Sequence, residues 1–293
     1  MTLFLGIDGG GTGCRAAVAD TQGHVLGQGM AGPANIATDV EGAAANILTA
    51  TTAALAQAGT GTLADLQAVL GLAGANVTAS AARLQALLPF ATTRIATDAM
   101  ISAKGALQDH DGIVAAMGTG SVFAVQRQGV VRQYGGRGFV LGDEGSGAVL
   151  GRALLAEALR AADGFTEMTP LLRDVLDEMG GMEAVISFSF RARPAEFAGL
   201  APRIVAGADA AAERIFGAAA QQVADILTHL HGNSPLPVVF LGGLGPHYAA
   251  RLADRWQIRP PLGTGLDGLA VNGGIGGNNT IYFCTSYNVN NII

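Results

Sequence analysis

The sequence predicts an α/β protein of two lobes whose cores are built alike. A chain of 293 residues is long for one compact core, so two domains of ordinary size are expected. Hydrophobic residues make up 49% of the chain and charged residues 14%, which suffices for buried sheets. A pattern of strand, glycine turn, strand, hairpin turn and strand near residues 3–29 returns near residues 112–134. Two copies of one unit predict similar lobes, although any two meanders look alike in a glycine-rich chain.

The first lobe is expected to open with three short strands and to continue with alternating helices and strands. Residues 20–23 are typical of a hairpin turn between the second and third strands, and Asp39 is a suitable N-cap for an alanine-rich helix. The apolar pattern predicts strands at 3–8, 14–19, 25–29, 66–72 and 92–96, and helices at 39–57, 78–88 and 98–107.

The second lobe repeats the strand pattern and then becomes mainly helical. Strands are expected at 112–117, 122–126, 130–134 and 237–241, and helices at 145–163, 168–179, 194–207, 209–231 and 246–254. Residues 262–269 lead into a further helical start. Residues 273–293 turn abruptly rich in glycine and asparagine, unlike the preceding chain, and no function is assigned to them.

Composition excludes several classes of function. The net charge is -6 and the single lysine is Lys104, which argues against a nucleic-acid partner. Cys14 and Cys284 lie far apart without metal-binding spacing, against a disulfide framework, a zinc site or an iron–sulfur site within one chain. Ser121 and Ser146 have no nearby histidine, against a hydrolase triad. Without a signal peptide or a long apolar run, we expect a soluble cytoplasmic protein that does not bind a membrane.

Two glycine turns at strand ends predict a phosphate site. Asp8-Gly9-Gly10-Gly11-Thr12 lies between two strands and is followed by Arg15, and Gly118-Thr119-Gly120-Ser121 repeats the arrangement. Glycine lets backbone N–H groups turn inward around an anion. Asp8 repels phosphate, but it can hold Mg²⁺ through water. A tight β-turn with a solvated aspartate is the alternative. Neither a Walker A loop nor a dinucleotide-binding GxGxxG pattern is present.

Acidic and amide side chains near other turns are further candidates. Asp98 lies between a predicted strand and a predicted helix, where it either caps the helix or accepts a hydroxyl proton. Asp143 and Glu144 lie in a glycine-rich loop before a long helix, with capping as the alternative to ligand binding. Asn35 offers an amide to a sugar hydroxyl or serves a turn. The glycines after strand 237–241 suit a base and ribose; they are Gly242, Gly243 and Gly245.

The order of these motifs resembles the sugar-kinase branch of the actin, heat-shock-chaperone and sugar-kinase superfamily. Within it, the chain is similar to the N-acetylglucosamine kinase and bacterial glucosamine kinase group, which is classed with the BadF/BadG/BcrA/BcrD ATPases. The resemblance covers about residues 3–270. It implies two ribonuclease H-like lobes that close over ATP, Mg²⁺ and a sugar. The first lobe would comprise residues 1–111 plus about 264–293, and the second residues 112–263 with a helical insertion.

The resemblance also implies roles for single residues. The two phosphate motifs fall on Asp8 to Thr12 and on Gly118 to Ser121, and the adenosine motif on Gly242, Gly243 and Gly245. Asp98 matches the catalytic aspartate that accepts the proton of the sugar hydroxyl. The positions expected to contact the sugar are Asn35, Asp98, Thr119, Gly120 and Asp143. Similar proteins often have tryptophan where this chain has Arg137, and Gly273-Gly274 interrupts the expected closing helix.

These inferences predict an enzyme that phosphorylates glucosamine or N-acetylglucosamine from ATP, at O6, and they allow a homodimer. Two alternatives stay open. One is an ATP-driven activator of a 2-hydroxyacyl-CoA dehydratase, which would need cysteines from two subunits to hold an iron–sulfur cluster. The other is a nucleotide-binding regulator without catalysis.

Overall fold

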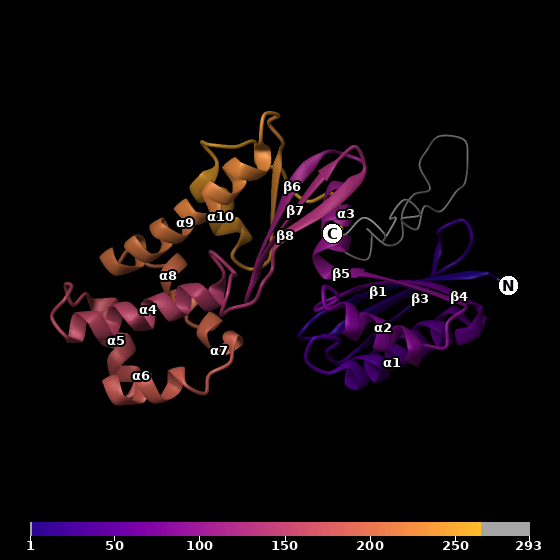
Figure 1. Cartoon of the computed structure of the whole chain (residues 1–293), viewed down its shortest axis with the longest axis horizontal. Helices are drawn as coiled ribbons and strands as arrows, with labels where there is room; N and C mark the ends of the chain where they lie inside the picture. Colours follow the sequence, from indigo (N-terminus) through magenta and orange to yellow (C-terminus); the bar gives the residue numbers. More distant parts are fainter. Residues whose placement is uncertain (1, 265–293) are drawn as a thin grey trace. The chain divides into compact units, whose positions relative to one another are not determined.

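The computed structural model describes residues 2–264 and divides the chain into two compact units (Figure 1). Among the described residues, the first unit contains 2–110, Gln126–Arg132 and 261–264. The second contains Asp111–Val125 and Gln133–Pro260. Several predictions fall on residues outside those described. They are the return of about 264–293 to the first lobe and the helix near 262–269, of which only the first residues are described, and the interruption at Gly273-Gly274. Cys284 and the segment 273–293 also lie outside the described residues.

The first unit is built on a five-stranded sheet in the order β3-β2-β1-β4-β5. The strands β1, β2 and β3 form an antiparallel meander, whereas β4 pairs in parallel with β1 and β5 in parallel with β4. The carboxyl ends of three parallel strands therefore meet at one edge. The strands are β1 (Leu3–Gly9), β2 (Cys14–Ala19), β3 (Val25–Ala31), β4 (Leu66–Leu72) and β5 (Thr92–Thr97).

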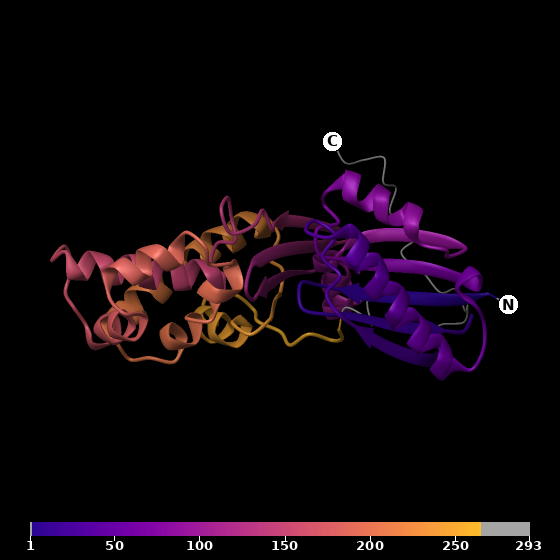
Figure 2. The same cartoon turned by 90° about the horizontal axis from the view of Figure 1, so that it is seen from below.

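Helices cover both faces of this sheet. Figure 1 shows α1 (Val40–Ala58) and α2 (Thr78–Leu87) on one face and α3 (Asp98–Leu107) on the other, and Figure 2 shows α1 across the strands. Asp39 caps α1 as predicted, because its carboxylate accepts from the Gly42 N–H at 2.8 Å. A Cβ at Gly29 would collide with the Ala50 carbonyl of α1. Glycine in β3 therefore lets the helix backbone lie directly on the sheet.

The second unit repeats the first four strands in the same order. Its sheet runs β8-β7-β6-β9, which matches β3-β2-β1-β4. The pairing of β6 with β9 is parallel, as is that of β1 with β4. The predicted fold of two α/β lobes with similar cores is therefore confirmed. The strands are β6 (Gly112–Met117), β7 (Ser121–Arg127), β8 (Val130–Gly135) and β9 (Val238–Leu241).

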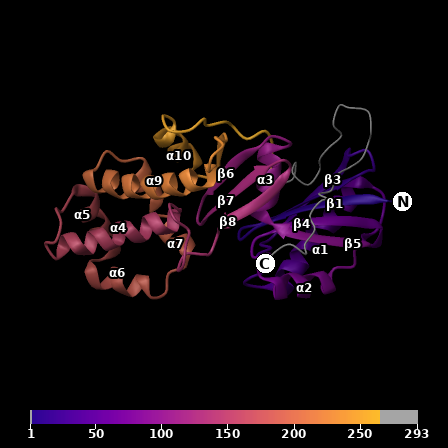
Figure 3. The ribbon, with the colours of Figure 1, turned by 45° about the horizontal axis from the view of Figure 1, so that its top comes forward.

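A helical insertion between β8 and β9 makes up most of the second unit. Its two long helices, α4 and α9, pack against each other (Figure 3). The prediction of one helix over 194–207 is wrong, because the chain breaks near Gly199, and the helix α6 was not predicted. The short connection before α6 contains Gly180 and Gly181, both with left-handed φ. The insertion contains α4 (Gly147–Ala162), α5 (Pro170–Met179), α6 (Met182–Ser189), α7 (Pro194–Ala198), α8 (Ala201–Val205) and α9 (Ala210–His231). The helix α10 (Gly245–Leu252) follows β9.

None of the helices within residues 2–264 is both long and apolar enough to cross a membrane.

Candidate functional site

The carboxyl ends of β1, β4 and β5 place two predicted aspartates at one edge of the first sheet. In the strand register, Asp8 of β1 lies beside Gly71 of β4, and Gly71 lies beside Ala96 of β5. Asp98 follows two residues after Ala96. This edge is where ligands bind in open α/β sheets. The fold therefore places Asp8 and Asp98 near each other, and the charge of Asp8 acts on the Asp98 carboxyl.

Asp98 is not the N-cap residue of its helix. The N-cap of α3 is Thr97, whose hydroxyl accepts from the Met100 N–H at 3.3 Å. Asp98 is the first residue of the helix, and its carboxylate accepts from the adjacent Ala99 N–H at 2.9 Å. Burial raises the pKa of Asp98, and the negative charge of Asp8 raises that pKa further. The carboxylate is thus half-buried, close to a second acid and not needed for the cap.

A close contact between β4 and α3 holds Asp98 in place. A Cβ at Gly71 would collide with the Ile101 side chain, one turn along α3 from Asp98. Ile101 is 4% exposed, so its side chain has little room to move away. Glycine at this position therefore sets how closely the first turn of α3 approaches the sheet.

Asp8 forms an ion pair with Arg15, its neighbour across the β1–β2 ladder. Arg15 is half exposed whereas Asp8 is largely covered. The adjacent Cys14 is buried, and burial together with the charge of Asp8 raises the pKa of its thiol to about 12. The cysteine is therefore a small apolar core residue at neutral pH, and Arg15 is the cation next to the turn.

The first glycine turn contains glycines of two kinds. A Cβ at Gly9 would lie 2.7 Å from Leu72 and 2.8 Å from Ala34, so packing requires glycine there. Gly10 and Gly11 have open space at the Cβ position and no left-handed φ. The Gly10 N–H donates to the Gly13 carbonyl at 2.9 Å, whereas within the described chain the N–H groups of Gly11 and Thr12 have no acceptor. The fold itself does not require glycine at 10 and 11, but the close approach of a ligand would.

The loop that carries Asn35 is bound to the same edge. The Ala34 N–H donates to the Gly10 carbonyl at 2.9 Å, and the Ile36 N–H donates to the Ala73 carbonyl at 3.0 Å. The Asn35 side-chain oxygen accepts from the Ala37 N–H at 3.0 Å, as in an Asx turn. Its amide nitrogen has no hydrogen-bond partner in the part of the chain that the structure covers. Asn35 therefore serves the turn with one atom and can offer the other to a ligand.

The second glycine turn is built by equivalent hydrogen bonds. The Gly118 N–H donates to the Gly120 carbonyl at 2.9 Å, and the Gly118 carbonyl accepts from the Gly147 N–H at 2.8 Å. No acceptor for the N–H groups of Thr119 and Gly120 is found among residues 2–264. The Ser121 hydroxyl donates to the Glu144 carbonyl at 2.8 Å, so its proton serves the fold. The backbone of Thr119 and Gly120 is the part of this turn that can meet an anion.

Asp143 is a buried acid in a strained conformation. It is 7% exposed and has φ of 63°, a left-handed value that is uncommon for a residue other than glycine. Burial raises the pKa of its carboxyl, although the carboxylate accepts from the backbone N–H groups of Ser121 and Gly138. A Cβ at Gly120 would lie 2.8 Å from the carboxylate. Asp143 is therefore fixed against the second glycine turn, and such strain is typical of functional sites.

The three glycines expected at the adenosine flank the start of α10. A Cβ at Gly242 would collide with the Met117 carbonyl, and the φ of Gly242 is 82°. Gly243 is open, whereas Gly245 lies close to the Phe240 backbone. The sequence missed the counterpart in the first unit, Gly74, which follows β4 with a φ of 83°. Extending the repeat to its fourth strand would have revealed it.

Arg137 lies on an exposed turn near Asp143. Gly138, the next residue, donates its N–H to the Asp143 carboxylate. Arg137 forms no ion pair with any residue that the structure describes. Phe139 anchors this loop beside Phe197, with 5.1 Å between the ring centroids. Arg137 thus adds a positive charge beside the loop that carries the Asp143 carboxylate.

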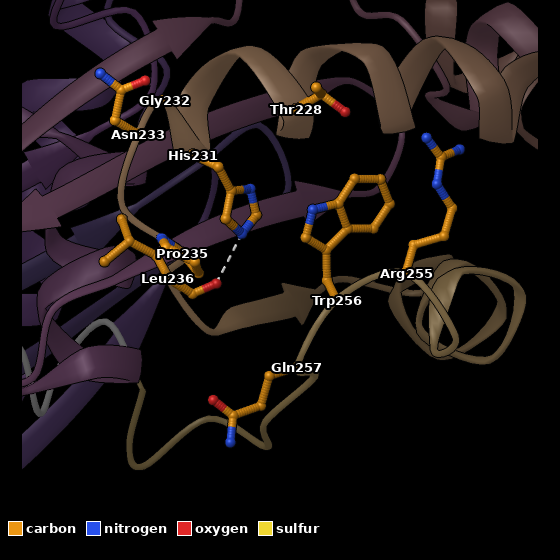
Figure 4. A pocket seen from close by; sticks show the side chains of 9 residues that line it. All are labelled: Thr228, His231, Gly232, Asn233, Pro235, Leu236, Arg255, Trp256 and Gln257. Atoms are coloured by element: carbon orange, nitrogen blue, oxygen red, sulfur yellow. Dashed lines mark hydrogen bonds between the residues drawn. The ribbon is translucent and has the colours of Figure 1, made fainter.

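The predicted residues form two groups, one in each unit. The first unit holds Asp8, Gly9, Gly10, Gly11, Thr12, Arg15, Asn35 and Asp98, and the second holds Gly118, Thr119, Gly120, Ser121, Asp143, Gly242, Gly243 and Gly245. A cavity of about 420 Å³ contains none of these (Figure 4). It lies at the opposite end of β9 from Gly242, where Trp256 stacks on His231.

The first group offers donors that fit a magnesium ion. Mg²⁺ prefers carboxylate oxygens and keeps most of its water, so it needs only one or two protein ligands. Asp8 and Asp98 are close enough for the charge of Asp8 to raise the pKa of Asp98. No cluster of three or more histidine, cysteine, aspartate or glutamate side chains suited to a metal occurs within residues 2–264. The pair Asp8 and Asp98 therefore suits an ion held largely by water and phosphate.

Residues 5–253 match the model of the BadF/BadG/BcrA/BcrD ATPase family. The chain is 31% identical over 270 residues to the glucosamine kinase GspK of Vibrio cholerae serotype O1, covering 89% of this chain and 92% of that protein. It is 28% identical over 203 residues to the N-acetylmuramic acid/N-acetylglucosamine kinase of Clostridium acetobutylicum, covering 65% of each.

Solved structures agree with these matches. A candidate N-acetylglucosamine kinase from Chromobacterium violaceum superposes with a TM-score of 0.81 and 31% identity, over 92% of this chain and 97% of that one. A second candidate N-acetylglucosamine kinase, from Porphyromonas gingivalis, gives a TM-score of 0.66 over the same shares at 21% identity, which shows the fold alone.

Proposed function

The chain belongs to the BadF/BadG/BcrA/BcrD ATPase family, and on that premise we propose that it transfers the γ-phosphoryl group of ATP to O6 of glucosamine or N-acetylglucosamine. The resemblance predicted from the motifs is confirmed, and the enzyme is an ATP-dependent sugar kinase. The choice of sugar and of hydroxyl is the proposal. The observation that carries it is Asp98, a carboxylate with a raised pKa beside Asp8 and the first glycine turn.

Asp98 acts as the general base in this proposal. Thr97 caps α3, so the Asp98 carboxylate is left to accept a proton from a sugar hydroxyl. Burial and the charge of Asp8 raise its pKa, which makes the carboxylate a stronger base than an exposed aspartate. The hydroxyl oxygen attacks the γ-phosphorus as its proton passes to Asp98. The bond between the γ-phosphorus and the β–γ bridging oxygen breaks, and ADP leaves with that oxygen and the electron pair.

The two glycine turns bind the phosphates in this proposal. Four backbone N–H groups that have no acceptor among residues 2–264 would donate to phosphate oxygens. They belong to Gly11, Thr12, Thr119 and Gly120. Arg15 adds positive charge next to the first turn, and Gly242, Gly243 and Gly245 bind adenosine.

Asp8 would hold Mg²⁺ through water. The ion supplies positive charge that neutralises the phosphate oxygens. Because Arg15 pairs with Asp8 in the structure, we expect the guanidinium to turn from the carboxylate toward the phosphates when nucleotide binds. Asn35, Thr119, Gly120 and Asp143 would orient the sugar. The Asn35 amide nitrogen and the Asp143 carboxylate are a donor and an acceptor that suit sugar hydroxyls.

A substrate panel tests this function. Purified protein with ATP and Mg²⁺ is given hexoses and amino sugars, and ADP release is measured in a coupled assay. We expect turnover with glucosamine or N-acetylglucosamine, loss of turnover after chelation of the metal, and a 6-phosphate product by NMR. A 6-deoxy sugar is the matched control. Phosphorylation of the 6-deoxy sugar would disprove O6 as the acceptor, and no turnover with any sugar would disprove the kinase.

Neither alternative gains support from the described residues. An iron–sulfur activator needs a cysteine thiolate, whereas Cys14 is buried and the pKa of its thiol is raised to about 12. Cys284 lies outside the described residues. A cluster absorption band in an anaerobic preparation would favour the activator. A regulator without catalysis would show no sugar phosphorylation in either the wild type or the Asp98→Asn variant.

A further inference from the structure

Tyr248 is a fully buried tyrosine whose hydroxyl has one specific partner. It lies on α10 at 0% exposure, and its hydroxyl donates to the Gly145 carbonyl at 2.7 Å. Burial raises the pKa of Tyr248, so the hydroxyl keeps its proton and remains a donor. Its ring packs beside Phe216 and Phe240, with centroid distances of 5.0 and 6.2 Å. Ring packing thus fixes the position of the hydroxyl. Its acceptor, Gly145, lies 103 positions earlier in the chain.

The acceptor belongs to the strained loop that carries Asp143. Asp143 and Gly145 both have left-handed φ values, of 63° and 74°. Three successive carbonyls in this loop accept hydrogen bonds: that of Asp143 from the Ser146 N–H, that of Glu144 from the Ser121 hydroxyl and that of Gly145 from the Tyr248 hydroxyl. Among the hydrogen bonds within residues 2–264, the Tyr248 bond is the one that joins the loop to α10. The conformation of Asp143 therefore depends on a side chain outside its own segment.

The same helix begins directly after two of the glycines expected to bind nucleotide. Gly242 lies against the Met117 carbonyl, and the Leu244 N–H donates to that carbonyl at 3.0 Å. Tyr248 follows Leu244 by one helical turn, and its N–H donates to the Leu244 carbonyl at 3.2 Å. A short helix is rigid over one turn, so a ligand that fixes Gly242 and Gly243 also fixes the Tyr248 hydroxyl. All of these residues lie in the second unit.

We propose that Tyr248 is a positioning residue that couples nucleotide binding at Gly242 and Gly243 to the placement of the Asp143 carboxylate, and so tightens sugar binding. The inference rests on the proposed function, since it takes the nucleotide and sugar roles of these residues from it. Coupling between two sites is reciprocal. Nucleotide therefore strengthens sugar binding by the same factor by which sugar strengthens nucleotide binding.

The test is the Tyr248→Phe variant, which keeps the packed ring and removes one hydroxyl. Calorimetry gives the Kd of glucosamine and N-acetylglucosamine with and without a non-hydrolysable ATP analogue and Mg²⁺. The coupling ratio is the sugar Kd without the analogue divided by the sugar Kd with it. We expect this ratio to be at least about five in the wild type and to fall toward one in Tyr248→Phe. Thr169→Val is the matched control, because it removes another buried hydroxyl bond of the same unit, that to Asp209 at 2.8 Å, far from the loop in sequence. Its ratio should match the wild type even if its Tm falls.

Hydrogen exchange provides a readout in the wild type alone. The analogue without sugar should slow exchange of the amides in residues 139–147, and in Tyr248→Phe this protection should be lost. A wild-type ratio in Tyr248→Phe, or a wild-type protein that phosphorylates sugar without any coupling, overturns the role of Tyr248 and leaves the kinase intact. Absence of sugar binding in the wild type overturns the proposed function instead. A loss of coupling in Thr169→Val equal to that in Tyr248→Phe shows a general effect of stability and also overturns the inference.

Discussion

Asp98→Asn should lower catalysis and raise stability in the same protein. The substitution keeps the shape of the side chain and an oxygen that can accept from the Ala99 N–H, the bond seen at 2.9 Å, but it removes the charge and the basic oxygen. A positioned general base contributes roughly 10²–10⁴-fold to a rate, which corresponds to about 3–5 kcal/mol of transition-state stabilisation. We therefore expect kcat for sugar phosphorylation to fall by about that factor with little change in the KM for ATP.

The gain in stability follows from the raised pKa of Asp98. Burial and Asp8 raise this pKa in the folded protein, so ionising the carboxyl costs more in the folded state than in the unfolded chain. The charge at the start of α3 is favoured by about 0.3–1 kcal/mol through the helix dipole, and the net rise of the pKa shows that burial and Asp8 outweigh it. The penalty is full above the folded pKa and absent below the unfolded value of about 4. Asp98→Asn should therefore be more stable than the wild type at neutral pH and lose this advantage on acidification.

Steady-state kinetics and thermal unfolding, each at several pH values, measure both effects. Asp109→Asn is a suitable control, because Asp109 is an exposed acid of the same unit that pairs with Lys104. Turnover of Asp98→Asn within about fivefold of the wild type would refute the role of base. A lower Tm at neutral pH, or a gain that grows on acidification, would refute the argument from burial.

Four further substitutions and one labelling experiment test the packing around the site. Gly9→Ala should destabilise the fold by about 1–3 kcal/mol, because its Cβ meets Leu72 and Ala34. Gly10→Ala should leave Tm unchanged or higher and weaken ATP binding. Equal effects of the two substitutions on Tm would contradict this difference. Gly71→Ala should destabilise the fold by about 1–3 kcal/mol and Ile101→Ala by about 2–5 kcal/mol. The double variant should be less destabilised than the sum of the two single variants by at least about 0.5 kcal/mol. The reason is that the new methyl group occupies space that the Ile101 side chain vacates. Cys14 should resist alkylation at pH 8 and react after denaturation, as peptide mass spectrometry can show; rapid labelling of the native protein would contradict its raised pKa.

The sheets were predictable from the sequence because short apolar runs end at glycine turns. β4 and α3 have the predicted bounds, and β6 does as well. The helical insertion was less predictable, since successive short helices share one apolar periodicity. Gly199 divides the predicted helix 194–207 into α7 and α8, and α6 begins after Gly181 without a side-chain cap. Such breaks depend on packing rather than on local pattern.

The site was predictable where strand ends determine it, and not where distant contacts do. Thr97 and Asp98 are both good N-cap residues in isolation. Thr97 takes the cap because β5 extends to it with ψ of 152°, and that extent is set by pairing with β4. Tyr248 could not be found, because a tyrosine in an amphipathic helix gives no sign of an acceptor 103 positions away. Gly74 had a detectable signal in the repeat.

The two turns make corresponding backbone hydrogen bonds, although the second is one residue shorter, and they differ in their side chains. The Gly9 carbonyl accepts from the Ala73 N–H, and the Met117 carbonyl accepts from the Leu244 N–H, each after the fourth strand of its sheet. By this equivalence, Ala116 stands where the first unit has Asp8, and Val122 stands where it has Arg15. The first turn therefore has a charged pair beside it, whereas the second has two apolar residues. A second carboxylate at position 116 would repel the phosphates that both turns are proposed to bind. The difference supports a division of roles, with the metal and the base on the first unit and a neutral anion cradle on the second.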